Sequence, residues 1–425
     1  MLVKYHIVIR MKVQMTLVRA TWQQRSCHFL LNLSAFSVCY LLGNALARQL
    51  LVTRHAALAF ESHIPFVPWM IVPYMSSGVF FCAAFWCVPG RDHLRMLSQR
   101  LLLASVLAGM VFVLYPLQFT WPRPPLERGF PAGLFGLLAI LDQPYNQLPS
   151  LHVAYCLILW QSLRLLTAGW GRILLAAWLF VTALATLFTY QHHVVDVAAG
   201  LLLGLLCVGM VRPDRSEPNV AFYYLMGAVI AAIVAVAIFR GFAGLHGAFA
   251  MPVLYLSVNL SLVCLAYFRR DRHFLHKTDG AHPWWAWLMY WPYLLGYLVT
   301  WLAVVRRERH KPPLKKVAPG LWVGRRLRES EVGFLPPACT VFDLASEMAE
   351  TAALRPVAMS PSSGGARYCH FPLMDLLEPP PQAMHDIVAA LREEITAGRN
   401  VYLHCAMGYS RCILLANAYL ADSGK

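Results

Sequence analysis

Long apolar runs, separated by short polar stretches, fill the first three-quarters of the chain. An apolar helix needs about 20 residues to cross the hydrocarbon core of a bilayer. The runs therefore predict about nine membrane-spanning helices, near residues 28–46, 66–89, 101–121, 150–168, 173–190, 193–211, 219–239, 243–267 and 284–305. The proline-rich segment 122–149 is the longest predicted loop between the early spans. A tight hairpin at Gln191 and His192 is expected to join the fifth span to the sixth.

The pattern changes after residue 316, where short strand-like runs alternate with helical stretches. Strands are predicted at 321–324, 340–344, 368–372 and 400–404, and helices at 381–397 and 413–421. Strands and helices in that order predict an α/β domain with a central sheet. The fold class is therefore a multi-pass α-helical membrane domain followed by a small α/β domain. The expected boundaries are a basic segment at 1–27, a membrane domain at 28–211, additional transmembrane helices at 212–305, a basic linker at 306–316 and the α/β domain at 317–425.

Composition supports this division. The chain is 58% hydrophobic and 13% charged, whereas soluble domains average about 25% charged residues. Eleven of the 21 acidic residues lie after Lys311, in the last quarter. The net charge of +15 comes from short basic clusters beside apolar runs, which is typical of juxtamembrane anchors. We therefore expect no nucleic-acid partner. The eleven cysteines have no zinc-site or disulfide-framework spacing, and we expect no metal and no cofactor.

The basic residues also bear on topology. Five of them precede the first span, which favours a cytoplasmic N-terminus in a bacterial inner membrane. The loop 122–149 and the turn at 191–192 then face outward. The last span is flanked by two basic stretches, 269–277 and 306–316, so either one of them violates the positive-inside rule or 284–305 does not cross. Reactive cysteine chemistry favours a reducing compartment, and we expect the C-terminal domain in the cytoplasm.

The segment from His404 to Arg411, His-Cys-Ala-Met-Gly-Tyr-Ser-Arg, joins a predicted strand to a predicted helix. A thiol at a helix N-terminus has a lowered pKa, and the free N–H groups there can cradle phosphate oxygens. Gly408 permits close backbone approach, and Arg411 offers a planar fork to two phosphate oxygens. His404 is expected to orient the loop. The pattern predicts Cys405 as a nucleophile inside an anion-binding cup; the alternative is a buried structural thiol.

This Cys-x5-Arg pattern after a strand resembles the protein tyrosine and dual-specificity phosphatase superfamily, over roughly 317–425. The resemblance implies that Asp375 protonates the leaving oxygen and then activates the hydrolytic water. Asp386 is the alternative acid, and a solvated surface role is the alternative for Asp375. Cys412 stands where the family has Ser or Thr, and Ser410 is the candidate to supply the missing hydroxyl. His404, Gly408 and Ser410 complete the expected phosphate-binding set.

A second constellation lies in the predicted spans. Ser150 and His152 open the fourth span, and His192 and Asp196 open the sixth, four residues apart. On a helix that spacing places both side chains on one face. A carboxylate can then hold one imidazole nitrogen and leave the other nucleophilic. Ionisable residues at membrane helix ends are costly and favour a functional role. The alternative is that these histidines anchor helix ends at the interface.

These residues resemble the type 2 phosphatidic acid phosphatase superfamily, over about 30–211. The matches are Arg123-Pro124, the run from Pro149 to His152, and His192 with Asp196. The chain departs from the family pattern in having Pro116 for a Lys, Leu151 for a Gly, and Ala185-Thr186 for Ser-Arg. The losses are similar to those of the inositol-phosphoceramide and sphingomyelin synthase branch, which transfers phospho-headgroups between lipids.

This resemblance implies a role for each matched residue. His192 attacks phosphorus, Asp196 orients His192, and His152 protonates the leaving alcohol. Arg123 and Ser150 contact the phosphate. With fewer phosphate-binding cations, the site is expected to prefer a less charged substrate such as a phosphodiester.

The combined expectation is a membrane enzyme with two sites. The first is a lipid-phosphate phosphatase or phospho-headgroup transferase, and the second is a Cys-dependent phosphatase. The expected partners are membrane phospholipids or lipid phosphates, with a phosphoprotein as the alternative substrate of the second site. Two other functions stay open: a membrane transferase regulated by a non-catalytic phosphate-binding domain, and a transporter or scaffold.

Overall fold

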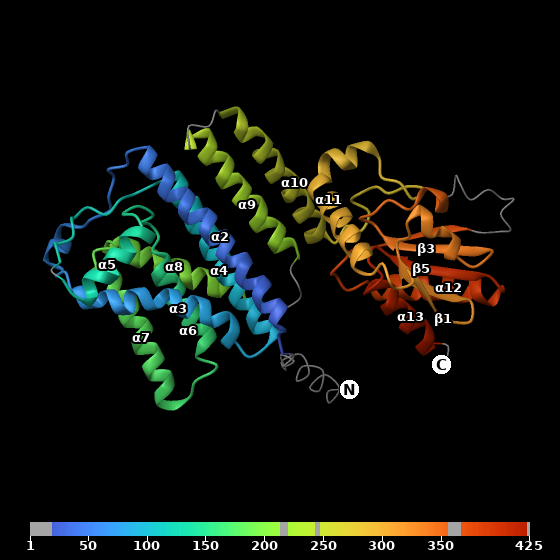
Figure 1. The fold of residues 1–425 in the computed structure, drawn as a ribbon, viewed down its shortest axis with the longest axis horizontal. Helices are drawn as coiled ribbons and strands as arrows, with labels where there is room; N and C mark the ends of the chain where they lie inside the picture. Colours follow the sequence, from blue (N-terminus) through green and yellow to red (C-terminus); the bar gives the residue numbers. More distant parts are fainter. Residues whose placement is uncertain (1–18, 127, 213–219, 243–246, 356–366, 423–425) are drawn as a thin grey trace, which may run out of the picture. The chain divides into compact units, whose positions relative to one another are not determined.

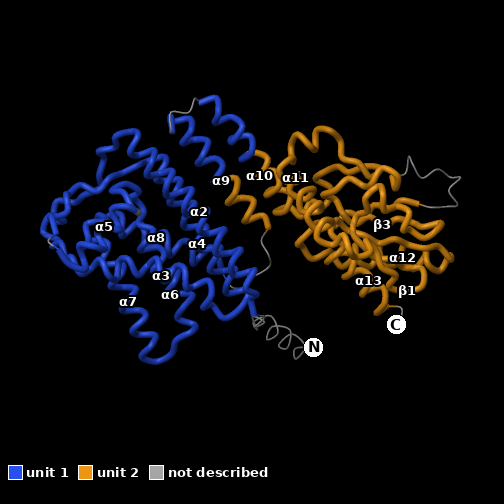
Figure 2. The backbone as a smooth tube through the Cα atoms, viewed as in Figure 1, with its two compact units in different colours: residues 1–217, 229–257 blue, residues 218–228, 258–425 orange. Residues whose placement is uncertain are grey.

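The computed structural model describes residues 19–126, 128–212, 220–242, 247–355 and 367–422 (Figure 1). The first 18 residues of the predicted basic segment 1–27 lie outside the described residues. The chain divides into two compact units (Figure 2). Unit 1 comprises Met1–Glu217 and Val229–Ser257, and unit 2 comprises Pro218–Ala228 and Val258–Lys425. Unit 2 thus contains two parts: the sheet, and residues that the sequence analysis assigned to the last predicted spans.

Unit 1 is helical. Its helices are α2 (Trp22–Gln49), α3 (Ile71–Cys87), α4 (Arg91–Leu114), α5 (Phe130–Leu141), α6 (Leu151–Leu163), α7 (Gly169–Phe188) and α8 (Val194–Met210), with short 3-10 helices at Ala59–His63 and Pro68–Met70. Helices α9 (Val220–Phe239) and α10 (Ala250–Arg269) each contain residues of both units. Helix α5 lies inside the segment 122–149 that was predicted as a loop; its apolar run of 12 residues folds onto α3.

Seven of the described helices are long and apolar enough to cross a membrane. They cover Trp22–Gln49, Pro68–Cys87, Arg91–Leu114, Gly169–Phe188, Val220–Phe239, Gly247–Arg269 and Trp284–Arg307. The predicted spans 150–168 and 193–211 coincide with apolar helices of 13 and 17 residues, α6 and α8. Every predicted span therefore falls on an apolar helix, and two of these helices are shorter than a simple crossing requires.

Helices α6 and α8 approach each other closely at the start of α6. A side chain at Gly200 of α8 would place its Cβ 2.4 Å from the carbonyl oxygen of Ser150. The backbone N–H of Ser150 donates to the carbonyl oxygen of Asp196 over 3.0 Å. The small residue and the backbone bond bring the two histidine-containing segments together.

The turn between α7 and α8 is longer than the hairpin predicted at Gln191 and His192. It runs from 189 to 193, so His192 precedes the helix and is not part of it. The cause is an N-terminal cap: His193 is the N-cap residue, and its backbone N–H donates to Asp196 Oδ2 over 2.8 Å. Helical stacking of His192 on Asp196 is therefore wrong as a description of how the two side chains meet.

Unit 2 contains a five-stranded sheet in the order β1-β2-β5-β3-β4. The strands are β1 (Leu314–Ala318), β2 (Leu321–Arg325), β3 (Cys339–Ala345), β4 (Tyr368–Leu373) and β5 (Asn400–Cys405). Strand β1 is antiparallel to β2, and the other neighbouring pairs are parallel. Strand β1 lies partly inside the predicted linker 306–316. The helices are α11 (Trp284–Arg307), α12 (Pro381–Thr396) and α13 (Arg411–Asp422), with short 3-10 helices at Glu329–Phe334 and Ala352–Leu354.

Alternation along β5 assigns its residues to opposite faces of the sheet. Leu403 and Cys405 pack in the apolar cluster that includes Leu391 of α12 and Leu415 of α13. Tyr402 belongs to a separate cluster on the other face. His404 follows the same alternation as Tyr402, and their rings stack 5.0 Å apart. The side chains of Cys405 and His404 therefore lie on opposite faces of the sheet.

Candidate functional site

The loop between β5 and α13 has Cys405 and Arg411 at its two ends. Cys405 ends β5, Arg411 begins α13, and both side chains are buried. Gly408 has a φ of +78°, and a Cβ there would lie 2.8 Å from the backbone nitrogen of Arg325. Both observations require glycine at this position. The backbone N–H of Arg326 donates to the carbonyl oxygen of Cys405 over 3.0 Å and fixes the start of the loop.

The Cys405 thiol has a strongly perturbed environment. Its sulfur lies 3.5 Å from that of Cys412. Hydrogen bonding from Cys412, which outweighs the opposing effect of burial, holds the pKa of Cys405 well below its usual range, with help from the Arg411 charge and the backbone N–H groups of Cys412 and Gly408. The pKa of Cys412 is raised because its proton is shared with Cys405. Ser410, the expected substitute donor, is exposed on the loop, and Cys412 is the side chain beside the nucleophile.

Arg411 is anchored by Glu347, which follows β3, and by Leu373, the last residue of β4. Its guanidinium forms a two-pronged ion pair with Glu347, with Nη1 3.0 Å from Oε2. Nη1 also donates to the carbonyl oxygen of Leu373 over 2.8 Å. The sequence analysis missed Glu347. A carboxylate in the short stretch after a fully buried strand was the available signal, because buried acids are seldom left unpaired.

Asp375 follows β4 and lies beside Arg411. Its Oδ1 is 3.4 Å from Arg411 Nε, and its Oδ2 accepts a hydrogen bond of 2.9 Å from the hydroxyl of Tyr297 in α11. The alternative acid, Asp386, is exposed on α12 and accepts from Gln382 over 2.8 Å. The structure therefore brings Asp375 to the cysteine loop and leaves Asp386 on the surface of the helix.

His404 lies in a buried polar network on the other face of the sheet. Its Nε2 is 2.7 Å from Glu350 Oε2 and 4.0 Å from Asp343 Oδ1. Burial opposes the charged imidazole, but Glu350 and Asp343 outweigh it and raise the pKa of His404. Lys277 forms a buried ion pair with Asp343, and Tyr368 donates to the same carboxylate over 2.8 Å. His404 thus anchors the strand before the loop, and its ring contacts protein carboxylates.

Asp343, Glu350 and His404 place one donor atom each within 4.8 Å of one another, a spacing that a metal ion could use. Burial opposes the ionised form of Asp343, but Lys277 and His404 hold the pKa of its carboxyl well below the usual range. The two carboxylates are thus matched by two cationic side chains of the chain itself. We assign the cluster to holding the fold together.

The His192 site, in unit 1, gathers the two histidine segments. His192 Nδ1 lies 3.8 Å from Asp196 Oδ2, and the His152 ring lies 6.1 Å from the His192 ring, centroid to centroid. His152 stacks on Tyr74 at 4.3 Å. His192 Nδ1, Asp196 Oδ1 and the Ser150 hydroxyl are buried with no hydrogen-bond partner among the described residues. Buried polar atoms of this kind are rare and call for an explanation such as a bound polar ligand.

Arg123 also reaches this region. Its Nε lies 3.1 Å from the side-chain amide of Gln191, and its guanidinium lies over the Phe135 ring at 5.6 Å. Asp142 accepts hydrogen bonds from Tyr40 and, over 3.4 Å, from Tyr74. Asp142 was not selected from the sequence because it sits in the segment read as a proline-rich loop. A lone acid beside an apolar run was the usable signal.

His193 is next to the predicted nucleophile His192, and each of its two ring nitrogens has a partner. Its Nδ1 lies 2.8 Å from Glu61 Oε2, its Nε2 lies 3.2 Å from the Thr120 hydroxyl, and its ring stacks on Phe119 at 4.5 Å. Glu61 also accepts from the backbone N–H of Val194 over 3.2 Å. The Glu61–His193 pair braces the turn that carries His192, and His192 Nδ1 has no hydrogen-bond partner in the part of the chain that the structure describes.

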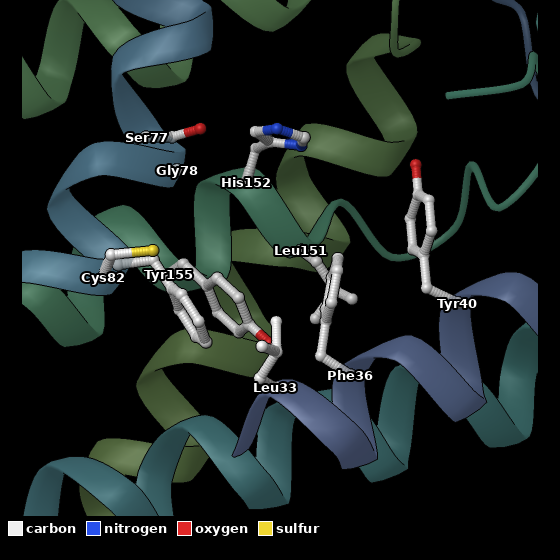
Figure 3. A pocket seen from close by; sticks show the side chains of 10 residues that line it. Leu33, Phe36, Tyr40, Ser77, Gly78, Cys82, Leu151, His152 and Tyr155 are labelled. Carbon is white, nitrogen blue, oxygen red and sulfur yellow. The ribbon is translucent and has the colours of Figure 1, made fainter. Parts of the chain in front are cut away.

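An apolar cavity of about 250 Å³ opens beside this site, between α2, α3 and α6. Figure 3 shows His152 and Ser77 at one end of the cavity and Leu33, Phe36 and Cys82 along the remainder. The cavity is therefore polar at the end that His152 lines and apolar along the rest of its length.

Comparison with protein-family models, with curated proteins and with solved structures finds no match to this chain. The two family resemblances accordingly rest on the quoted sequence motifs alone.

Proposed function

We propose that the chain is a membrane enzyme of phospholipid metabolism with two phosphoryl-transfer sites. The site at His192 cleaves or transfers the phospho-headgroup of a lipid. The site at Cys405 hydrolyses a phosphate monoester. Seven helices compatible with membrane crossing support the membrane setting.

The observation that carries the lipid site is the group of unpartnered buried polar atoms at Ser150, His192 and Asp196, which lies next to the apolar cavity. A phospholipid presents the matching combination of a charged phosphate and an acyl chain. The ring separation of 6.1 Å between His152 and His192 also suits one phosphorus centre. An attacking nitrogen needs about 3 to 3.5 Å to its target, and a proton donor needs about 3 Å to the leaving oxygen.

In this mechanism the free nitrogen of His192 attacks phosphorus while Asp196 stabilises the imidazolium that forms. His152 donates a proton to the departing alcohol, and Arg123 offsets the charge of the phosphate. Water then attacks the phosphohistidine for hydrolysis, or a second lipid hydroxyl attacks for transfer. The scarcity of cations favours a phosphodiester, and hydrolysis of phosphatidic acid much faster than headgroup exchange would contradict that preference.

At the second site the Cys405 thiolate attacks phosphorus, and the P–O bond to the leaving group breaks as Asp375 gives its proton to the leaving oxygen. Water then attacks the phosphocysteine, transfers a proton to Asp375 and releases inorganic phosphate and the thiolate. Arg411 and the loop N–H groups hold the phosphoryl oxygens throughout. The low pKa of Cys405 supports this role, because the thiolate is the nucleophile.

The second candidate function for the domain that carries Cys405 is phosphate binding without catalysis, and one observation favours it. Cys412 replaces the hydroxyl that assists breakdown of the phosphocysteine in the resembled family, and its thiol lies 3.5 Å from Cys405. A poor second step would turn the domain into a phosphate-dependent regulator of the membrane site.

The test uses the purified full chain in lipid nanodiscs. The variants are His192→Ala and Cys405→Ser, with exposed His63→Ala and half-buried Cys369→Ser as matched controls. We expect His192→Ala to abolish conversion of phospholipid and to spare hydrolysis of p-nitrophenyl phosphate, with the reverse pattern in Cys405→Ser. Full lipid conversion in His192→Ala would refute His192 as the nucleophile, and a parent chain that converts no lipid would favour a transporter or scaffold. Full aryl phosphate hydrolysis in Cys405→Ser would refute the cysteine mechanism.

A further inference from the structure

The second half of α11 packs against the cysteine loop. Trp301 and Val305 form one apolar cluster with Ala406, and Met407 packs against it. The indole N–H of Trp301 donates to the carbonyl oxygen of Arg326 over 3.1 Å. The backbone N–H of Arg326 in turn donates to the carbonyl oxygen of Cys405. A helix that looks like a membrane span thus contacts the loop that carries the nucleophile.

Tyr297 lies one helical turn before Trp301, so both side chains project from the same face of α11. Its hydroxyl donates to Asp375 Oδ2 over 2.9 Å. The other oxygen of that carboxylate lies 3.4 Å from Arg411 Nε. The hydrogen bond from Tyr297 restrains rotation of the carboxyl group about its Cβ–Cγ bond, and the Arg411 side chain faces its other oxygen.

The helix is held on the domain at both ends. Near its C-terminal end, Arg307 donates to the hydroxyl of Tyr409 in the cysteine loop over 2.7 Å. Before its N-terminal end, His282 Nε2 lies 2.7 Å from the carbonyl oxygen of Ser346, and Lys277 forms its buried ion pair with Asp343. Tyr297 is therefore presented to Asp375 from a fixed support, as precise positioning of an acid requires.

We propose that Tyr297 is a positioning residue for the acid Asp375, so that the Cys405 site is complete only when α11 is present. The inference rests on the proposed function of that site. The proton of Asp375 matters most for a phosphate monoester of an alkyl alcohol, such as the phosphate of a glycerolipid. An alkoxide is a poor leaving group and needs the proton of Asp375, whereas a nitrophenolate leaves readily without it.

The test compares two leaving groups in the full chain carrying His192→Ala, which removes the contribution of the other site. A well-placed general acid contributes about 10²- to 10⁴-fold, and a displacement of about 1 Å costs about 10²-fold. In Tyr297→Phe we expect kcat for an alkyl phosphate to fall roughly 10- to 100-fold. We expect KM to change little, and the rate with p-nitrophenyl phosphate to change by only about threefold or less.

Tyr290→Phe is the matched control, because it removes a hydroxyl from the same helix at a ring that packs on Phe274. We expect it to leave both substrates unaffected. Asp375→Asn should reproduce the selective loss, and adding Tyr297→Phe to it should cost little more, since the tyrosine acts through that carboxylate.

Equal rates for Tyr297→Phe and its parent with both substrates would overturn the proposal, and so would an equal fall with both, which would indicate only a structural role. A parent chain whose hydrolysis is unchanged by Cys405→Ser would instead refute the proposed function itself. The two failures are thus distinguishable by the cysteine variant.

Discussion

At the scale of single residues, the pair Cys405 and Cys412 decides how the second site behaves. The two sulfurs are 3.5 Å apart, and the shared proton lowers the pKa of one thiol and raises that of the other. The lowered pKa favours the thiolate of Cys405, which is the nucleophilic form of the side chain. The donor that stabilises this thiolate is a side chain, so its contribution can be removed without changing the loop backbone.

We expect Cys412→Ala to raise the pKa of Cys405. A hydrogen bond to a charged group contributes about 1.5 to 3 kcal/mol, and each pKa unit corresponds to about 1.4 kcal/mol. The midpoint for alkylation of Cys405 by iodoacetamide, followed by mass spectrometry of its peptide, should therefore move upward by roughly one to two pH units. Cys412→Ser keeps a donor and serves as the control. An unchanged midpoint in Cys412→Ala would show that Arg411 and the backbone suffice.

The residues of the cysteine loop could be selected from the sequence because they are contiguous. The distant residues that contact Arg411 and Asp375 could not be selected in this way. Glu347 lies 64 positions before Arg411, and Tyr297 lies 78 positions before Asp375. Nothing in the spacing of a single chain indicates which of several buried acids or tyrosines the fold brings to a loop. At the membrane site, the same limit hid Glu61, which lies 132 positions from His193.

At the scale of elements, the segment between α10 and α11 belongs to the sheet domain. The side chains of Lys277 and Asp343 are both about 1% exposed, and Lys277 also donates to the carbonyl oxygen of Ala345 over 2.8 Å. The backbone of Gly280 accepts from the N–H of Glu350 over 2.7 Å. The residues that lead into α11 are thus joined to the strand end that supports the network around His404.

Lys277→Met is expected to destabilise this half of the chain strongly. It would leave Asp343 buried without its cation, and breaking a buried pair costs about 3 to 5 kcal/mol. Pulse proteolysis of the sheet domain across a urea series measures the change. The control is Lys311→Met, since Lys311 is 71% exposed and pairs with Glu308 at 3.5 Å; exposed pairs contribute about 1 kcal/mol or less. Equal urea midpoints for the two variants would contradict the assignment.

Most elements could be predicted from periodicity alone. The four expected strands and the two helices of the last quarter occur at nearly the expected positions. Strand β1 was missed because it is an edge strand with exposed Lys315 and Lys316, and such charges resemble a linker. Helix α5 was missed because prolines around it signal a loop, although Pro131 occupies the first turn of the helix, where proline is tolerated.

At the scale of the whole molecule, α11 bears on the conflict between the two basic stretches that flank it. Residues 297–307 contact the sheet domain, so at most 284–296 can enter a bilayer. At about 1.5 Å per residue that part is about 20 Å long, whereas the hydrocarbon core is about 30 Å thick. We infer that α11 does not cross, which places both basic stretches on the same side.

This inference predicts the sidedness of the two sites. Reporters inserted near Asp279 and fused after Lys425 should both read the cytoplasm, and a reporter in the turn at 189–193 should read the exterior. The expected reason is that the basic stretches on either side of α11 stay on the cytoplasmic face. A periplasmic signal after Lys425 with a cytoplasmic signal at Asp279 would mean that α11 crosses. If the prediction holds, the His192 and Cys405 sites act on opposite leaflets.

The buried pair of Lys277 and Asp343 has a consequence for how the protein is made. The two residues are separated by 66 positions, so a ribosome synthesises the lysine long before its partner exists. Until the third strand emerges, the segment before α11 carries a cation that has no place in either lipid or a folded core. We therefore expect a nascent chain that ends before Asp343 to leave Lys277 without the carboxylate that pairs with it in the folded domain.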